Sequence, residues 1–515
     1  MAAVKQIGVI GGGTAGYFAA IALKRAAPWL RVTVVESSKI PIIGVGEATT
    51  PPMVPFLHRA LGIDVVDFFA TVQPTWKLGI KFLWGKRPHF CYPFGDAELA
   101  AAYAYEHDPD ACSLTARLMA ADRFPIVDST FGPCSLLPEL RFAYHLDNRR
   151  FVAYLAAHAK RCGVEHLDRT ITDVVLDERG AIGELKTAEG DPVRFDLYID
   201  ATGFRSLLVG QALGSPFQSY ASTLLCDRAV VADVPHGGHL KPYTLAETMD
   251  AGWCWAIPQV ERDHRGYVYS SAFLDDAAAE AEMRRKNPGM TAPWQVKFRS
   301  GRLRDIWIHN AFAIGNAYGF VEPLESTALH MVILEVHALA GELARVAPSG
   351  GEPDRARLSR ELGESWDYLR WFLGIHYRFN ARLDTPFWRA CRDQVDVSGI
   401  EDWLARYRAH GPLTAQGLAA DRRDLVFGPR GVDVLLLGQD VPCPPPAPAI
   451  PPGAWQRRRD QETAAARVAW PQAKALELLR NRPDLLQELV DSPHGWPAAL
   501  ARELSSRSRE EARVT

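Results

Sequence analysis

The sequence lacks the patterns that mark several large classes of protein. Its eight cysteines are scattered, with no CxxC pair and no Cys/His spacing typical of a zinc site. No apolar run approaches the roughly 20 residues that a membrane helix needs, and the opening MAAVKQIGVIGGG does not have the pattern of a signal peptide. We therefore expect a cytoplasmic protein with no disulfides, no bound metal and no membrane association.

An excess of charge of either sign is also missing. The 58 Lys and Arg residues against 61 Asp and Glu residues give a formal net charge of -3, which argues against nucleic acid as a partner. The chain does have a hydrophobic share of 47%, with 14 Trp, 15 Tyr and 22 Phe among its 515 residues. This composition suits a large core of two to four domain-sized units and a pocket for flat apolar molecules.

The first 36 residues predict a nucleotide-binding βαβ unit. KQIGVI (5–10) is typical of a short buried strand, a glycine turn then enters a helix, and RVTVVE (31–36) predicts the next strand. Such a unit holds a pyrophosphate at the positive N-terminus of its helix.

The glycines of this turn form the pattern GxGxxG. Gly11 permits the tight turn, Gly13 lets the backbone approach a pyrophosphate, and Gly16 permits close packing of helix on strand. Glu36 ends the second strand, 20 residues after Gly16, where a carboxylate would accept hydrogen bonds from ribose hydroxyls. The predicted cofactor-binding residues here are Gly11, Gly13, Thr14, Ala15, Gly16 and Glu36.

Two later segments favour FAD over NAD as the cofactor. FDLYIDATGFRS (195–206) is a strand leading into ATG, as in flavoprotein monooxygenases, and AFAIGNAYGF (311–320) is a strand that ends at Gly315 and Asn316. Three separated nucleotide-facing segments fit the long FAD molecule better than NAD.

The rest of the chain alternates between loops and regular elements. We expect a loop over 37–56, an irregular aromatic region over 85–145 and a helix over 148–162. Three strands are predicted near 171–178, 182–188 and 194–200, mainly helical structure from about 330, and a proline-rich connection over 442–453 that is followed by a polar helical tail.

Four unrelated motifs occur in a characteristic order: GVGEATTP (44–51), PTWKLGIKF (74–82), GWCWAIP (252–258) and GFVEPLESTALHM (319–331). Over roughly residues 5–390 the chain thereby resembles the flavin-dependent tryptophan halogenases. The resemblance implies an α/β fold, with a Rossmann-like FAD-binding module of the flavoprotein monooxygenase type and an interleaved, mostly helical substrate module. We expect the FAD-binding module over 1–345, with a substrate-side insertion near 85–145, and the helical module with the C-terminal tail over 346–515.

The resemblance also implies a reaction. Such an enzyme uses FADH2, O2 and chloride or bromide to make hypohalous acid, which halogenates an electron-rich aromatic ring, such as that of tryptophan or another indole in secondary metabolism. Flavin and substrate would occupy separate compartments joined by a tunnel. The expected partners are a separate flavin reductase, a small aromatic substrate and a second copy of the chain in a homodimer.

Three residues are the predicted catalytic groups. Lys77 matches the lysine of the family that handles the oxidant, by hydrogen-bonding hypohalous acid or by carrying the halogen on its amine. Glu325 matches the glutamate that stabilises the ring cation and takes its proton, or polarises the oxidant; as an acid at a helix start it could also cap backbone amides. Ser326 matches the serine that links the tunnel to the flavin side.

The same motifs place the halide and more of the flavin. Thr327 and Ala328 match the halide-binding step, where backbone N–H groups hold the anion. Many members of the family have ESTG where this chain has ESTA, and Ala does not easily adopt the positive φ that Gly permits. Gly46 and Ala48 of the first motif, with Gly315, complete the predicted cofactor site.

Aromatic residues define the two compartments. Trp253 and Trp255 match the WxWxIP signature and are expected to line the flavin side, so that no substrate can sit there; alternatively both are ordinary core residues of a strand. Tyr92 and Phe94 match positions that contact the indole in tryptophan-specific members, which often carry His and Phe there.

Three alternatives remain at this point. The enzyme could halogenate a phenol or a larger indole-bearing product, it could be a flavin-dependent monooxygenase that hydroxylates, or it could bind flavin without catalysis. Lys77 and the Trp253/Trp255 pair argue against the monooxygenase, and Lys77 together with Glu325 argues against the protein without catalysis.

Overall fold

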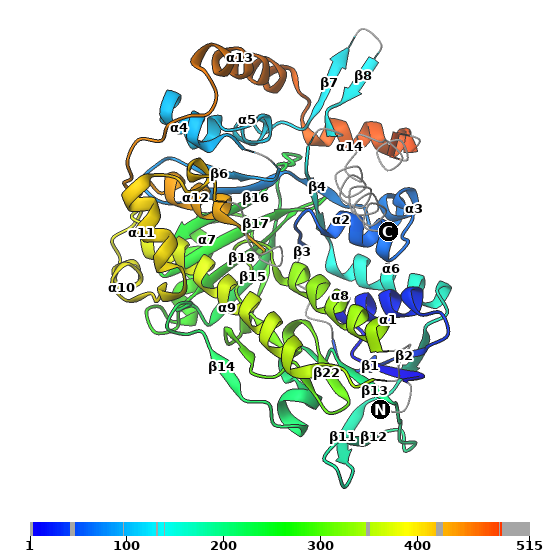
Figure 1. Cartoon of the computed structure of the whole chain (residues 1–515). Coiled ribbons are helices and arrows are strands. Elements are labelled where there is room, and N and C mark those ends of the chain that lie inside the picture. The colour runs from blue at the N-terminus through cyan, green and yellow to red at the C-terminus, as the bar shows by residue number, and fades with distance from the viewer. Residues whose placement is uncertain are drawn as a thin grey trace, which may run out of the picture.

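The computed structural model describes residues 4–41, 47–95, 97–129, 132–137, 140–346, 351–418, 426–483 and 485–486. Two sheets organise the molecule (Figure 1). A six-stranded sheet lies near the N-terminus, a seven-stranded sheet lies in the upper half of the view, and the long helices α8 (Ala328–Val346) and α9 (Arg355–Phe379) run between them.

The six-stranded sheet is the predicted nucleotide-binding sheet. Its Ile7, Val9 and Ile10 are buried, as expected of a parallel strand that is covered on both faces. Every pair is parallel except the last, β22 with β21. The order is β10 (Glu165–Asp168), β2 (Arg31–Glu36), β1 (Gln6–Ile10), β13 (Leu197–Asp200), β22 (Ala311–Ala313) and β21 (Trp307–Ile308).

The seven-stranded sheet carries the WxWxIP motif on its central strand, β17 (Gly252–Pro258). Its pairs are antiparallel except for β16 with β5, and all seven residues of β17 are buried. The order is β19 (Thr291–Lys297), β15 (Arg228–Val234), β18 (Asp263–Tyr269), β17 (Gly252–Pro258), β16 (Thr244–Met249), β5 (Gly79–Leu83) and β6 (Phe90–Pro93).

Smaller sheets complete the strand content. The first presents Lys77 at the end of its strand β4, and the β11–β12 hairpin projects at the bottom of Figure 1. They are β3 (Glu47–Ala48), β9 (Ala143–Leu146) and β4 (Thr75–Lys77); β14 (Phe217–Ser219), β20 (Gly301–Leu303) and β23 (Gly319–Phe320); and the hairpins β7 (Ile126–Ser129) with β8 (Gly132–Ser135) and β11 (Ile171–Leu176) with β12 (Ile182–Thr187).

Helices cover both sheets, and α1 packs against α6 and α8. The helix that follows the glycine turn buries Phe18 and Ile21 completely. Besides α8 and α9, the helices are α1 (Thr14–Ala26), α2 (Met53–Pro55), α3 (Val65–Thr71), α4 (Leu99–Glu106), α5 (Leu114–Ala120), α6 (Asn148–Arg161), α7 (Asp276–Lys286), α10 (Pro386–Gln394), α11 (Glu401–His410), α12 (Pro429–Gly438), α13 (Pro452–Val468) and α14 (Gln472–Asn481). None of the helices within these described ranges has the length and hydropathy to cross a bilayer.

Most predicted elements are present. The strands β1 and β2, the helices α1 and α6, and the strands β11, β12 and β13 lie where the pattern placed them. Residues 442–451 have no helix or strand, and α13 and α14 follow as the helical tail. The expected loop over 37–56 contains, in its described part, one strand of two residues, one helix of three and the first residue of a π-helix, Phe56–Ala60.

The prediction that 85–145 is irregular was wrong. This region contains β6, α4, α5, β7, β8 and β9. The signal that was missed is capping: the Ser113 side chain accepts a hydrogen bond from the N–H of Ala116 at 3.2 Å and starts α5. His107, with φ of +50°, ends α4 in a left-handed conformation where glycine is the usual signal.

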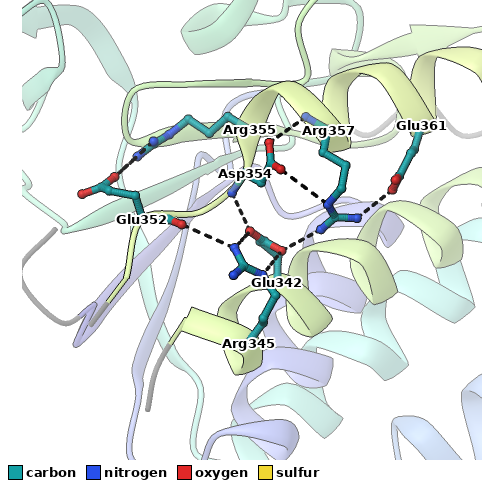
Figure 2. A network of polar contacts seen from close by, with 7 residues as sticks. All are labelled: Glu342, Arg345, Glu352, Asp354, Arg355, Arg357 and Glu361. Atoms are coloured by element: carbon teal, nitrogen blue, oxygen red, sulfur yellow. Dashed lines mark hydrogen bonds and ion pairs between the residues drawn. The ribbon is translucent and has the colours of Figure 1, made fainter. Parts of the chain in front are cut away.

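A cluster of charged side chains joins α8 to α9 (Figure 2). The Glu342 carboxylate is buried and accepts hydrogen bonds from Arg345 at 2.5 Å, from Arg357 at 2.7 Å and from the backbone N–H of Asp354 at 2.5 Å. These donors lower the pKa of Glu342 to about 2, the side-chain hydrogen bond from Arg345 being the largest cause. The cluster spans the predicted module boundary at 345/346.

Glu342→Gln is expected to destabilise the protein by about 1–3 kcal/mol at pH 7, because the charge that three donors share is lost. Since the folded pKa of about 2 lies below the ordinary value of 4.5, this stabilisation is present above pH 4.5 and disappears as the pH falls through 2. Thermal unfolding of both proteins should therefore show a difference in Tm that narrows as the pH is lowered from 7 towards 3. Glu361→Gln is the control, because Glu361 is 44% exposed and contacts Arg357 alone among the cluster residues; it should change stability by less than about 0.5 kcal/mol. Equal effects of the two substitutions would contradict this account.

Candidate active site

A cavity of about 490 Å³ opens beside the glycine turn. Its walls combine the three segments that the sequence assigned to FAD with residues of the seven-stranded sheet. Arg169 and Arg205 add positive charge to the lining, which suits a pyrophosphate. Of the predicted cofactor residues, the cavity is lined by Gly11, Gly13, Thr14, Ala15, Glu36, Ala48 and Gly315, whereas Gly46 lies outside the described residues.

The glycines of the turn meet different constraints. Gly11 has φ of +122°, and a Cβ on Gly16 would lie 2.0 Å from the carbonyl oxygen of Gly11, so both positions need glycine. A Cβ on Gly12 would lie 1.5 Å from Oε2 of Glu36. A Cβ on Gly13 would meet nothing within 4 Å, because Gly13 faces the cavity.

These residues fit a bound FAD. The hydroxyl oxygen of Thr14 is buried without a hydrogen-bond partner among the described residues, at the start of a helix whose N-terminus favours an anion. The carboxylate of Glu36 is held by the Tyr17 hydroxyl at 2.7 Å and by His166 Nε2 at 2.8 Å, and it lines the cavity where a ribose would be placed.

Lys77 lies outside this cavity but is joined to it through Ser326. The ammonium nitrogen of Lys77 donates a hydrogen bond to the Ser326 hydroxyl oxygen at 2.7 Å, and Ser326 is one of the residues that line the cavity. Lys77 is fully buried and its nitrogen lies 5.3 Å from the centroid of the Phe94 ring. Ser326 is therefore the connection between the flavin side and the lysine.

Burial changes the protonation of this lysine. It lowers the pKa of Lys77 from 10.5 to about 7, while the negative charge of Glu325 raises it in part. Both the ammonium and the amine are thus accessible near neutral pH.

Glu325 precedes Ser326 and is 1% exposed. One carboxylate oxygen, Oε1, lies 2.8 Å from Nε2 of His376, which comes from α9. Among the described residues, no hydrogen-bond donor contacts its second oxygen. His376 is not among the site residues predicted from the sequence.

Glu322 has a different environment. Its Oε2 accepts hydrogen bonds from the indole N–H of Trp253 at 2.7 Å and from the hydroxyl of Tyr377. Burial raises the pKa of Glu322 to about 7. These two neutral donors tie it to the seven-stranded sheet and to α9.

The turn before α8 corrects the expectation about Ala328. The residue with positive φ is Ser326, at +59°, whereas Ala328 is the first residue of the helix α8. Ala at this position therefore meets no conformational obstacle. Thr327 is fully buried with its hydroxyl oxygen unpartnered among the described residues, and Ala328 lines the cavity, so the helix start that would hold a halide is present.

The two tryptophans of β17 do not share the role expected of them. Among the described residues, Trp255 lines the cavity and Trp253 does not. The indole N–H of Trp253 donates a hydrogen bond to Glu322 instead. Their rings lie 6.0 Å apart on the same face of the strand. Trp253 thus packs beside Trp255 without lining the cavity itself.

Tyr92 lies in β6 and Phe94 directly follows that strand; neither is among the described residues that line the cavity. Both are buried, and Tyr92 contacts the Phe427 ring at 5.8 Å and the Arg430 guanidinium at 5.9 Å. Burial raises the pKa of Tyr92, the charge of Arg430 lowers it in part, and the charge of Glu325 raises it further. The structure therefore brings together Lys77, Glu325, Ser326, Tyr92 and Phe94 next to the flavin cavity.

Sequence reasoning also missed residues that line the flavin cavity. Glu47 lies in the first motif, and burial raises its pKa to about 7; the amide of Asn148 donates to it at 3.2 Å. Thr244 lines the cavity and contacts His145, whose pKa burial lowers strongly. No group of three or more His, Cys, Asp or Glu side chains with the geometry of a metal site occurs among the described residues.

Gly13→Val is expected to abolish FAD binding while the protein stays folded, because the valine side chain would enter the cavity rather than the protein interior. Gly341→Val is the control: Gly341 also has open space around it, but it lies exposed on α8 away from the cavity. Titration with FAD, followed by flavin fluorescence, should show wild-type affinity for the control alone. Unchanged affinity in Gly13→Val would contradict the assignment of this cavity to FAD.

Comparison with known proteins agrees with the geometry. A family model described as tryptophan halogenase matches residues 6–450. The chain is 32% identical over 455 residues to the tryptophan 6-halogenase ThaL of Streptomyces albogriseolus, covering 80% of this chain and 83% of the relative. It is 31% identical over 463 residues to the tryptophan 7-halogenase RebH of Lentzea aerocolonigenes, covering 82% and 85%.

Solved structures show the same fold. MibH, described as a "lathipeptide tryptophan 5-halogenase", superposes with a TM-score of 0.91 and 47% identity, over 96% of this chain and 97% of MibH. BrvH, a flavin-dependent halogenase from Brevundimonas sp. BAL3, superposes with a TM-score of 0.80 and 30% identity, over 92% and 99%. With its α/β fold, its Rossmann-type flavin module and a family match over residues 6–450, the chain belongs to the tryptophan halogenase family and is a flavin-dependent halogenase.

Proposed function

We propose that this enzyme halogenates the indole ring of a tryptophan residue within a peptide, by means of hypohalous acid guided from the flavin cavity to Lys77. The observation that carries the chemistry is the 2.7 Å hydrogen bond between the Lys77 nitrogen and the Ser326 oxygen, at the wall of the cavity. It offers a direct polar connection between the flavin compartment and a buried lysine.

Bound reduced FAD supplies, with O2, the oxidation of chloride or bromide to hypohalous acid. The residues of this chain then control where that oxidant goes. Thr327 and Ala328 hold the halide at the start of α8, and Trp255 occupies the side of the cavity where an aromatic substrate would otherwise approach the flavin. Ser326 passes the oxidant on to Lys77.

Lys77 meets the oxidant in either protonation state. With a pKa of about 7, its ammonium can hydrogen-bond the oxygen of hypohalous acid, and its amine can take the halogen. In both cases the halogen is presented beside Phe94, whose ring lies 5.3 Å from the lysine nitrogen.

Glu325 completes the substitution. The ring carbon forms its bond to halogen, the oxygen–halogen bond of the oxidant breaks, and the oxygen leaves as water after it takes a proton from the Lys77 ammonium, which is restored by the proton that Glu325 then removes from the ring. The ring then loses the proton of the same carbon to the Glu325 carboxylate, so that ring and hypohalous acid become halogenated ring and water. A carboxylate beside the ring also stabilises its cationic intermediate.

The peptide substrate is supported by the comparison with MibH. The chain is 47% identical to this protein, described as acting on a tryptophan of a "lathipeptide", and 31–32% identical to ThaL and RebH. Tyr92 stands where the tryptophan-specific pattern often has His.

A separate flavin reductase supplies the reduced FAD, since the sequence contains no second glycine-rich nicotinamide site.

Lys77→Met is expected to lose halogenation almost completely while flavin binding and its reoxidation by O2 continue, because methionine keeps the volume but not the amine. Glu325→Gln should be slower by about 100- to 10,000-fold, the usual contribution of a general base. Product mass and flavin absorbance are followed together. Lys81→Met is the control, because Lys81 is another largely buried lysine four residues along the chain whose nitrogen lies over Tyr243; it should keep halogenating. Product from Lys77→Met at a rate near wild type would refute the mechanism.

A peptide that contains tryptophan is expected to be halogenated with a kcat/KM at least about tenfold above that of free L-tryptophan, a difference of 1.4 kcal/mol in transition-state binding. The assay uses a flavin reductase, NaCl or NaBr, free L-tryptophan, indole, a phenol and a set of tryptophan-containing peptides, with detection by mass spectrometry. Equal or higher kcat/KM for the free amino acid would overturn the peptide proposal and leave the halogenase chemistry intact.

A further inference from the structure

Two consecutive residues of α9 hold the two glutamates of the GFVEPLES segment. His376 contacts Glu325 with 2.8 Å between Nε2 and Oε1, and Tyr377 donates its hydroxyl hydrogen to Glu322. All four side chains are at most 1% exposed. The two contacts differ in kind, because the tyrosine is a neutral donor and the histidine can carry a proton of its own.

The hydrogen bonds of His376 determine where its protons lie. Its Nδ1 lies 3.2 Å from the backbone oxygen of Leu373, and since a carbonyl oxygen can only accept, Nδ1 carries a hydrogen. Its Nε2 faces the Glu325 oxygen, and an ionised carboxylate can also only accept. One proton therefore lies between Nε2 and Oε1, and the pair is neutral overall whichever atom holds it.

Because the His376–Glu325 pair is neutral overall, burying Glu325 leaves no uncompensated charge in the interior. An isolated carboxylate in a fully buried site is strongly disfavoured unless it is paired and hydrogen-bonded. Lys77 interacts with the charge of Glu325 without direct contact, because its nitrogen bonds to Ser326 and forms no ion pair among the described residues. His376 compensates the charge and leaves Lys77 free for the oxidant.

The imidazole is held in place by aromatic rings on several sides. Phe82, Trp84 and Phe372 lie with ring centroids 5.3, 6.3 and 5.7 Å from that of His376. The indole N–H of Trp84 also bonds to the backbone oxygen of His376 at 2.7 Å. A ring packed in this way cannot rotate away from Glu325 without displacing these neighbours.

We propose that His376 is the positioning residue for Glu325: it fixes one carboxylate oxygen and turns the other towards the substrate ring. The inference rests on the proposed function, in which Glu325 takes the ring proton. His376 touches neither substrate nor flavin and acts through Glu325 alone. The same role is not open to Tyr377, whose partner Glu322 is also held by Trp253.

The experiment is a double-mutant cycle on the single-turnover rate of halogenation. His376→Gln keeps an N–H that can reach Glu325 but removes the ionisable group, and it should lower the rate about 10- to 100-fold, as loss of residues that orient a functional group commonly does. His376→Phe preserves the ring packing and removes the donor, and it should be slower still. In the Glu325→Gln background either change should cost less than about twofold.

FAD affinity and flavin reoxidation by O2 should remain at wild-type values in all of these variants. His158→Gln is the control, because His158 is a buried histidine of α6 that bonds to the backbone oxygen of Leu61, far from Glu325 in the chain; its effect, if any, should be the same with and without Glu325→Gln. If His376→Gln does not fold, His376→Phe completes the cycle.

Two results would overturn the proposal. A rate in His376→Phe equal to that of wild type would show that Glu325 needs no partner. If the fold-loss of rate in a His376 variant and the fold-loss in Glu325→Gln multiply in the double variant, His376 acts through packing and not through Glu325. Failure of the proposed function itself is seen separately, as halogenation that survives in Lys77→Met or is unaffected by Glu325→Gln alone.

Discussion

The active site depends on a fully buried lysine whose nitrogen bonds to Ser326, a serine that also faces the flavin cavity. Burial lowers the pKa of Lys77 to about 7, which makes the amine available. The buried ammonium form is energetically unfavourable, and the fold has to compensate for it. Ser326, which accepts the hydrogen bond from Lys77, has a φ of +59°. Such a conformation costs a non-glycine residue about 1–3 kcal/mol when it is strained. The surrounding structure must hold this turn in place.

The helix α8, which starts two residues after Ser326, provides that support because it is tied to its surroundings along its length. Near its middle, the buried Glu335 accepts hydrogen bonds from the N–H of Gly315 at 2.7 Å and from the indole N–H of Trp366 at 3.1 Å. The turn at Gly315, which lines the cavity, and α9 are therefore both attached to α8. Near its end, Glu342 is bonded to arginines of α8 and α9 (Figure 2). The geometry at Ser326 is thus fixed by contacts on two helices rather than by the turn alone.

The sequence predicted the parts of this arrangement whose signal is local. The glycine turn, the strands beside it and the polar residues of the four motifs are each recognised within a dozen residues, and the family comparison confirmed the fold and the enzyme class. Helices such as α5 were missed because their hydrophobic periodicity is short and only the cap at Ser113 marks the start. The expectation about Ala328 was wrong because pattern matching assigns φ from the residue type, whereas the turn places the strained conformation at Ser326.

What the sequence could not indicate is pairing across long distances. His376 lies 51 residues after Glu325, and nothing near either residue shows that α9 returns to this point. The choice between the two nearby carboxylates follows from the same geometry. Glu322 has one oxygen held by Trp253 and Tyr377, two neutral donors that supply no charge, so burial raises its pKa to about 7 and its role is that of a structural link. Glu325 instead faces a side chain that can share a proton with it. A carboxylate that must accept a proton from a ring and return to its starting state needs such a partner, and α9 supplies it at Glu325 alone of the two.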